Sequence, residues 1–269
     1  MRLRRVIQGG QVALIALAFV VGGGVGGAVI IFRETIALVQ VTTFGTGSER
    51  LFAYIDQLPW WHVVGVPTIG GIIVGLLVKY IMPEKRPEGV ADVIEAGALR
   101  GGRMSGSIGL KAALINALSI GFGASVGREG PAVHFGAALG GWLSGSLNLN
   151  RSVSRTLLGC GAAAAVAASF NAPIAGALFA SEVVLGHYAL SAFAPVVIAS
   201  VTATAMSRFY FGDFPAFIIH EHVIQSLWEF PAFVIFGIVA GIVAMGFMKS
   251  IMLTSSVADK LVVPNFLKP

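Results

Sequence analysis

The chain of 269 residues carries too little charge for an ordinary soluble domain. Charged residues make up 12% and hydrophobic residues 56%, whereas soluble domains contain about 25% charged residues. The mean hydropathy is +0.84, and the 35 glycines suit helices that approach one another closely in lipid. The composition argues against a soluble protein and predicts an integral membrane protein.

The net charge of +5 and the pI of about 9.7 come from cations that bracket apolar segments. We interpret them as orientation signals rather than as a nucleic-acid-binding surface, and we expect no nucleic-acid partner. Three arginines within residues 1–10 precede the first apolar segment, which continues to Ile31 and is too long for a cleaved signal peptide. We therefore expect a multi-pass protein of the cell membrane, with the N-terminus and the 83–107 loop in the cytoplasm.

The apolar segments form an irregular series of expected helices. They cover 11–40, 62–82, 91–99, 108–126, 131–147, 152–170, 173–186, 190–211 and 231–262. Several are shorter than the ~20 residues of a membrane span. Broken helices are tolerated in lipid where they are buried in protein or line a polar cavity, so the interruptions indicate a transport site near the bilayer middle.

Two of the breaks place an acidic residue beside a helix start. In "PEGVADVIEAGAL" the helix follows Gly89 and carries Asp92 near its first turn, and in "GREGPAVHF" we expect Pro131 to be the first helical residue. A helix start offers unpaired N–H groups and a partial positive charge of roughly +0.5. Two such starts aimed at one buried point would form an anion site. Glu129 lies at the mouth of the second helix, where its carboxylate would take the place of an anion.

Glu129 also has a plainer interpretation, as a surface carboxylate or as the partner of Arg128 in a structural ion pair. A charge near the bilayer centre costs roughly 2.5–3.5 kcal/mol on insertion scales. Such a carboxylate should therefore lie near water, be paired, or be protonated. We favour a gating role at the edge of an anion path.

Other motifs predict neither a metal site nor a cofactor. His134 follows Glu129 without an H-E-x-x-H pattern, so we expect a histidine on a helix face rather than a ligand. Cys160 is the single cysteine and is expected to be a small buried thiol. The run "GGGVGG" at 22–27 is expected to pack helices.

Three stretches resemble the CLC family of chloride channels and transporters. They are "GREGPAVHFGAALG", which is similar to the family's G-R-E-G-P signature, "GCGAAAAVAASFNAPIAGALFASE" and "DVIEAGALRGGRMS". The resemblance covers about 60–212 and implies an all-α integral membrane fold with inverted repeats, broken and re-entrant helices, and a homodimer with one pore in each subunit. It also implies that Glu129 is the gating glutamate and that chloride is the bound ligand. The anion pathway would contain Glu88, Gly89, Val90, Arg128, Gly130, Pro131 and Ala132.

The chain departs from the family pattern at two positions of this pathway. Glu88 stands where the family's G-S-G-I-P motif has the serine that coordinates the central anion. An ionised Glu88 would repel chloride, unless it is protonated, points away, or leaves the anion to backbone N–H groups. The inner glutamate that relays protons in family exchangers would follow Glu182, but this position is Val183, which is typical of family channels.

The resemblance also predicts the domain organisation. One transmembrane repeat fills 11–212, a connecting loop 213–230, and the first helix of an incomplete second repeat 231–269. The fold would be truncated after about half, and a full-length chain or a partner would supply the missing repeat.

Several functions stay open. The favoured one is a voltage-gated-type chloride channel or transporter. The alternatives are a chloride/proton antiporter and a non-conducting membrane subunit. An intramembrane enzyme using Glu129 and His134 lacks a second catalytic group, so we expect no enzyme.

Overall fold

The computed structural model describes residues 10–47, 54, 56–213, 224 and 226–260, and every regular element within them is helical. The predicted all-α architecture is confirmed. Contacts divide the chain into a first unit, 1–216, and a second unit, 217–269. The expectations for the N-terminal arginines, for most of the 213–230 loop and for the last nine positions lie outside the described residues.

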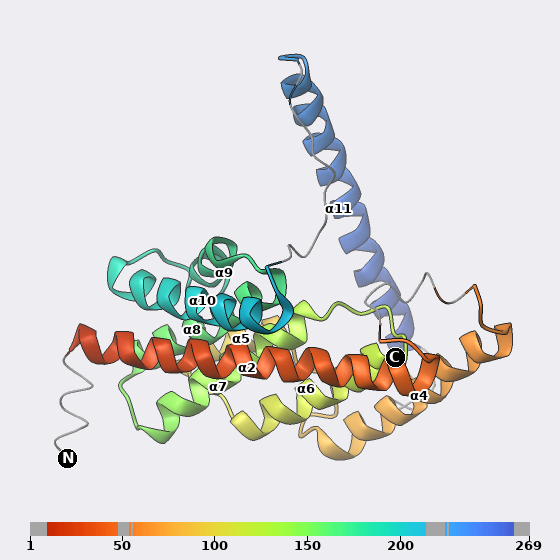
Figure 1. Cartoon of the computed structure of the whole chain (residues 1–269), viewed down its shortest axis with the longest axis horizontal. Coiled ribbons are helices and arrows are strands. Elements are labelled where there is room, and N and C mark those ends of the chain that lie inside the picture. The colour runs from red at the N-terminus through yellow and green to blue at the C-terminus, as the bar shows by residue number, and fades with distance from the viewer. Residues whose placement is uncertain (1–9, 48–53, 55, 214–223, 225, 261–269) are drawn as a thin grey trace. The chain divides into compact units, whose positions relative to one another are not determined.

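Long helices at both ends of the described chain flank shorter ones between them (Figure 1). In the first unit they are α2 (Gln11–Phe44), α4 (Trp60–Ile81), α5 (Val90–Ala98), α6 (Gly106–Gly121), α7 (Glu129–Ser146), α8 (Arg151–Phe170), α9 (Pro173–Phe179), the π-helical η1 (Ala180–Leu185) and α10 (Leu190–Phe211). The second unit contains α11 (Glu229–Lys260). Within the described residues, five helices, namely α2, α4, α8, α10 and α11, are long and apolar enough to cross a membrane. This is the broken helical pattern that the sequence predicts.

Several helices end at a residue that adopts left-handed backbone angles. Gly45 ends α2 with φ of +77°, and its N–H donates to the carbonyl of Val41, as glycine commonly does after a helix. Asn171 ends α8 with φ of +56°. Gly123, with φ of +92°, follows the end of α6 at Gly121, which explains why this helix stops before the expected residue 126.

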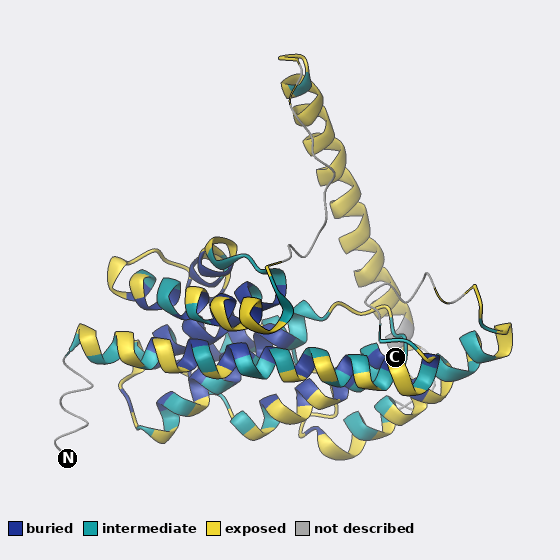
Figure 2. Ribbon diagram, in the orientation of Figure 1, coloured by how far each residue is buried: buried dark blue, intermediate teal, exposed yellow. Residues whose placement is uncertain are grey.

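The core of the first unit surrounds α8. In the most apolar stretch of this helix, 78% of the residues are buried. Small residues dominate its buried positions, so that α7, α9, α10 and α2 all pack against it. Figure 2 shows the buried residues concentrated in this part of the first unit. Cys160 is fully buried as a free thiol, as predicted.

Glycines allow α2 and α10 to approach closely. A methyl group at Gly22 would lie 2.8 Å from the Cα of Ala199, and one at Gly26 would lie 3.1 Å from the Cα of Ala203. Gly24, on another face of α2, has nothing within 4 Å. The prediction that the 22–27 glycine run packs helices is therefore confirmed.

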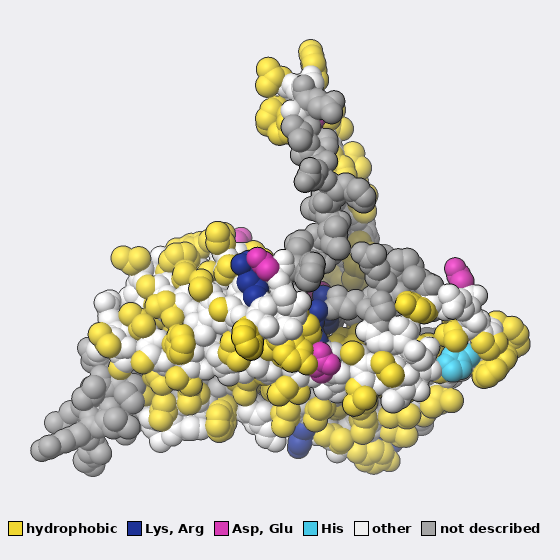
Figure 3. All heavy atoms as spheres, in the orientation of Figure 1, with side chains coloured by type: hydrophobic (Ala, Val, Ile, Leu, Met, Phe, Trp, Pro, Cys, Tyr) yellow, Lys and Arg dark blue, Asp and Glu magenta, His cyan; other side chains and the backbone are white. Residues whose placement is uncertain are grey.

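The outer surface of the first unit is largely apolar, and its visible face carries few charged side chains (Figure 3). Large exposed side chains on α4 include Trp60 and Trp61, at 78% and 61% exposure. Tryptophans near the end of a span suit the membrane interface. The surface and the five apolar helices together indicate an integral membrane protein.

Candidate functional site

The start of α7 differs from the expected one by two residues. Its first residue is Glu129, and the carbonyl of Arg128 accepts the N–H of Ala132 at 3.1 Å. Pro131 is the third helical residue, where its missing N–H leaves no bond unmade, so the prediction that it opens the helix is wrong. Glu129 and Gly130 therefore lie inside the first turn, where the positive end of the helix dipole acts on the carboxylate.

The Glu129 carboxylate bends back over Gly127. A methyl group at Gly127 would lie 2.5 Å from Oε2 of Glu129 and 3.7 Å from its Cδ. The carboxylate occupies this place because position 127 has no side chain. Glu129 is half-buried, whereas Gly127 is exposed.

Replacing Gly127 with alanine should therefore move the Glu129 carboxylate at little cost in stability, because the side chain that must shift is flexible. If Glu129 gates anion flux, the flux at neutral pH should change by about 2- to 10-fold, corresponding to a rotamer penalty of about 0.5–1.5 kcal/mol. Chloride efflux from liposomes measures this change. The same substitution in a Glu129→Ala background should have no effect, and an equal effect in both backgrounds would contradict the coupling.

One N–H group at the start of α5 is bound by the helix's own first-turn carboxylate. The N–H of Gly89 donates to Oδ2 of Asp92 at 2.8 Å, and Nη2 of Arg86 donates to Oδ1 at 2.6 Å. Arg86 also donates from Nε to Oε2 of Glu84 at 2.8 Å. The helix begins at Val90, directly after Gly89, as expected. The Gly89 N–H is not unpaired, however, because Asp92 accepts it.

Glu88 lies in the connection before α5, outside the five apolar spans. Its Oε2 is 2.9 Å from Nε2 of His134 on α7, and the side chains are 13% and 1% exposed. The N–H direction is not aligned for a hydrogen bond, and neither ring nitrogen of His134 has a hydrogen-bond partner among the described residues. Burial, followed by the nearby charge of Asp92, raises the pKa of the Glu88 carboxyl above its ordinary value.

This contact changes the expectation for Glu88. The sequence left three ways to avoid repulsion of an anion: protonation, pointing away, or coordination by backbone alone. The structure adds a fourth, because His134 lies against Glu88 and balances the carboxylate whenever the imidazole is protonated. The sequence predicts only a helix-face histidine at His134, and no spacing connects it with Glu88.

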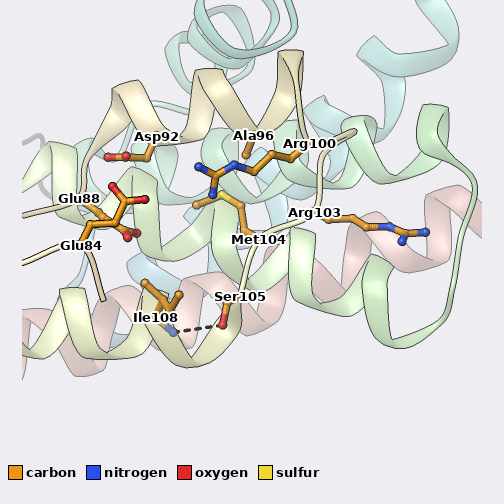
Figure 4. Close-up of a pocket in the computed structure, with 9 residues that line it drawn as sticks. All are labelled: Glu84, Glu88, Asp92, Ala96, Arg100, Arg103, Met104, Ser105 and Ile108. Atoms are coloured by element: carbon orange, nitrogen blue, oxygen red, sulfur yellow. Dashed lines mark hydrogen bonds between the residues drawn. The ribbon is translucent and has the colours of Figure 1, made fainter. Parts of the chain in front are cut away.

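A cavity of about 300 Å³, here called the α5 pocket, lies beside these groups. It is lined by Glu84, Glu88, Asp92, Ala96, Arg100, Arg103, Met104, Ser105 and Ile108. Figure 4 shows the three carboxylates gathered at one side of the pocket, while Arg103 extends away from them. Nη2 of Arg100 donates to Oε1 of Glu95 at 2.8 Å. The pocket combines both signs of charge, and no motif in the sequence predicts a site role for its arginines.

The predicted relay position lies on a different element. Glu182 and Val183 belong to η1, which packs against α5 and α8. Both side chains are exposed, with Val183 at 38%, and neither lines the α5 pocket. The structure therefore brings Glu88 to α7, but it places Glu182 and Val183 outside this pocket.

The sequence is similar to those of chloride channel proteins. A family model described as voltage gated chloride channel matches residues 70–269. A putative chloride channel protein ClcB-like from Ralstonia nicotianae is 34% identical over 232 residues, which are 85% of this chain and 54% of that protein. Chloride channel protein CLC-e from Arabidopsis thaliana is 28% identical over 273 residues, which are 94% of this chain and 37% of that protein. The chain spans about half the length of the curated relatives it matches.

Solved structures share the fold. A structure described as a slow cyanobacterial Cl⁻/H⁺ antiporter matches with a TM-score of 0.77 and 23% identity, over 94% of this chain and 61% of that one. A CLC-type fluoride/proton antiporter matches with a TM-score of 0.74 and 24% identity, over 93% and 60%. The predicted CLC-like fold is confirmed, and with the family match over most of its length the chain belongs to the voltage-gated chloride channel (CLC) family.

Proposed function

We propose that this chain contributes to the anion pathway of a chloride channel or transporter in which Glu129 is the gate. The observation that carries the proposal is the position of Glu129 in the first turn of α7, with its carboxylate folded back over Gly127. The positive end of a helix attracts an anion and a carboxylate alike. Glu129 can therefore compete with chloride for the same place.

The gate follows from this competition. When Glu129 is ionised, its carboxylate holds the place at the α7 start and chloride is excluded. When Glu129 binds a proton, it loses the charge that holds it there, and an anion can enter. Arg128, Gly130, Pro131 and Ala132 would border the path at α7, while Glu88, Gly89 and Val90 would border it at α5.

The assembly is part of the same proposal. The pathway works in a homodimer embedded in the bilayer, with the second repeat supplied by a full-length chain or a partner. Chloride or a similar anion is the bound ligand, and no further cofactor is required. The orientation with a cytoplasmic N-terminus follows from the Lys and Arg bias around the first two spans.

Passive conduction is favoured over proton exchange by Val183, because valine at the relay position carries no proton. The antiporter is the second candidate, since both solved structures described above are named as proton antiporters. A non-conducting subunit is the third, motivated by Glu88 at the place of the family serine.

Flux measurements separate the three candidates. The native gene product is reconstituted in liposomes, and chloride efflux and external pH are recorded together, with protein-free liposomes as the control. A channel gives efflux without coupled proton movement, and an antiporter gives chloride-driven proton movement that an uncoupler abolishes. The absence of chloride efflux from correctly folded protein would contradict the first two candidates and support a non-conducting subunit.

A further inference from the structure

His134 is an unusual buried group in this structure. Its side chain is 1% exposed, and both ring nitrogens lack a hydrogen-bond partner among the described residues. Buried polar atoms in native proteins are nearly always hydrogen-bonded, so an exception calls for a functional or structural explanation. Nε2 lies 2.9 Å from the Glu88 carboxylate, so the imidazole is placed to share a proton with it.

Glu88 and His134, whose side chains are 13% and 1% exposed, can together hold one proton. With this proton the pair has no net charge, whether the proton lies on the imidazole or on the carboxyl. Without it, the neutral imidazole leaves the carboxylate uncompensated, and the pair carries one negative charge. Because the two groups are in contact, they titrate as a unit rather than separately.

The other charges near the pair already have partners. Arg86 is bound by Glu84 and Asp92, and Arg100 is bound by Glu95. These side chains come from the connection before α5, from α5 itself and from the turn after it. Two residues further along α7, the groups nearest to Gly136 are uncharged and come from Val25 on α2 and from Gly161 and Ala165 on α8. The proton on the pair is thus one variable charge at this end of the α5 pocket, beside the carboxylates of Glu84 and Asp92.

We propose that Glu88 and His134 form a proton-binding site that controls anion occupancy of the α5 pocket. The proposal rests on the proposed function, because it requires an anion to enter this part of the pathway. The protonated pair tolerates an anion in the pocket that Glu88 lines, whereas the deprotonated pair repels it. This site is separate from Glu129, which does not line the pocket.

Thermodynamic linkage makes the proposal measurable. If a proton on the pair favours anion binding, anion binding must favour proton uptake to the same extent. Adding chloride near neutral pH should therefore draw protons from the solution. Glu129 could produce a similar signal, so the measurement is made in a Glu129→Gln background, where the gating position cannot titrate.

The experiment uses the native gene product in detergent and weak buffer. Chloride is added, proton uptake is followed with a pH indicator, and chloride binding is measured by calorimetry on the same samples. We expect uptake to persist in Glu129→Gln and to fall to the buffer baseline when Glu88→Gln is added. Glu129→Gln with Glu34→Gln is the matched control, since Glu34 is an exposed carboxylate on α2 that does not line the pocket; it should retain uptake.

The outcomes distinguish failure of the proton-binding site from failure of the proposed anion pathway. Chloride binding without proton uptake in Glu129→Gln, or uptake that survives Glu88→Gln, overturns the proton-binding site and leaves the proposed function intact. No chloride binding in any form of the folded protein contradicts the proposed function itself. His134→Gln, checked for folding by gel filtration, provides a second test, because it should also abolish uptake while keeping a polar side chain of similar length.

Discussion

Replacing Glu129 with glutamine should raise chloride flux at neutral pH by about tenfold and remove most of its pH dependence. The ionised carboxylate in the first turn of α7 gains up to ~2 kcal/mol from the helix dipole in partly buried geometries, and ~1.4 kcal/mol corresponds to tenfold in occupancy. Glutamine keeps the size of the side chain but cannot compete as an anion. Wild-type flux should therefore rise toward that of the variant as the pH falls.

Chloride efflux from liposomes over a series of pH values measures this effect. Glu34→Gln is the matched control, because Glu34 is an exposed carboxylate on α2; its pH profile should remain that of the wild type. A Glu129→Gln protein with an unchanged rate and an unchanged pH profile would show that Glu129 is a structural or surface carboxylate.

Replacing Gly161 with alanine should lower the thermal stability of the protein by several degrees. A methyl group at Gly161 would overlap the carbonyl of Gly136 and lie 3.1 Å from the Cα of Ala137. These are backbone atoms, so α7 and α8 must move apart. Overpacking of this kind costs about 1–3 kcal/mol, and each kcal/mol lowers the midpoint by about 2–4 °C in a domain of this size.

Thermal unfolding in detergent measures this destabilisation. Gly145→Ala is the matched control on α7, since a methyl group there meets nothing within 4 Å. It should leave the midpoint unchanged or raise it, because alanine favours a helix over glycine by about 1 kcal/mol. Equal midpoints for Gly161→Ala and the wild type would mean that the close α7–α8 contact does not hold these helices together.

Most of the helices could be predicted because long apolar segments are the dominant signal in this chain. The expected segments correspond to the observed helices, but several ends differ. α2 continues to Phe44 until Gly45 terminates it, and the segment expected at 173–186 is divided into α9 and the π-helical η1. Helix ends depend on individual backbone hydrogen bonds and dihedral angles, which hydrophobic pattern does not specify.

The candidate site was predictable only where charge stands out against an apolar background. Glu129 and Glu88 are conspicuous in this way, and the family resemblance gave each an expected role. The contact between Glu88 and His134 arises because α5 packs against α7, and no sequence spacing encodes that packing. The hydrogen bond from the Gly89 N–H to Asp92 likewise depends on a side-chain rotamer.

The central claim is that the Glu129 carboxylate takes the place of an anion at the start of α7. The most direct test is to locate bromide by anomalous diffraction in crystals of the wild type and of Glu129→Gln, grown in bromide at the same pH. The account predicts bromide beside the first turn of α7 in the variant and weaker or no bromide there in the wild type. Equal bromide occupancy in both proteins, or none at this place in either, would contradict it.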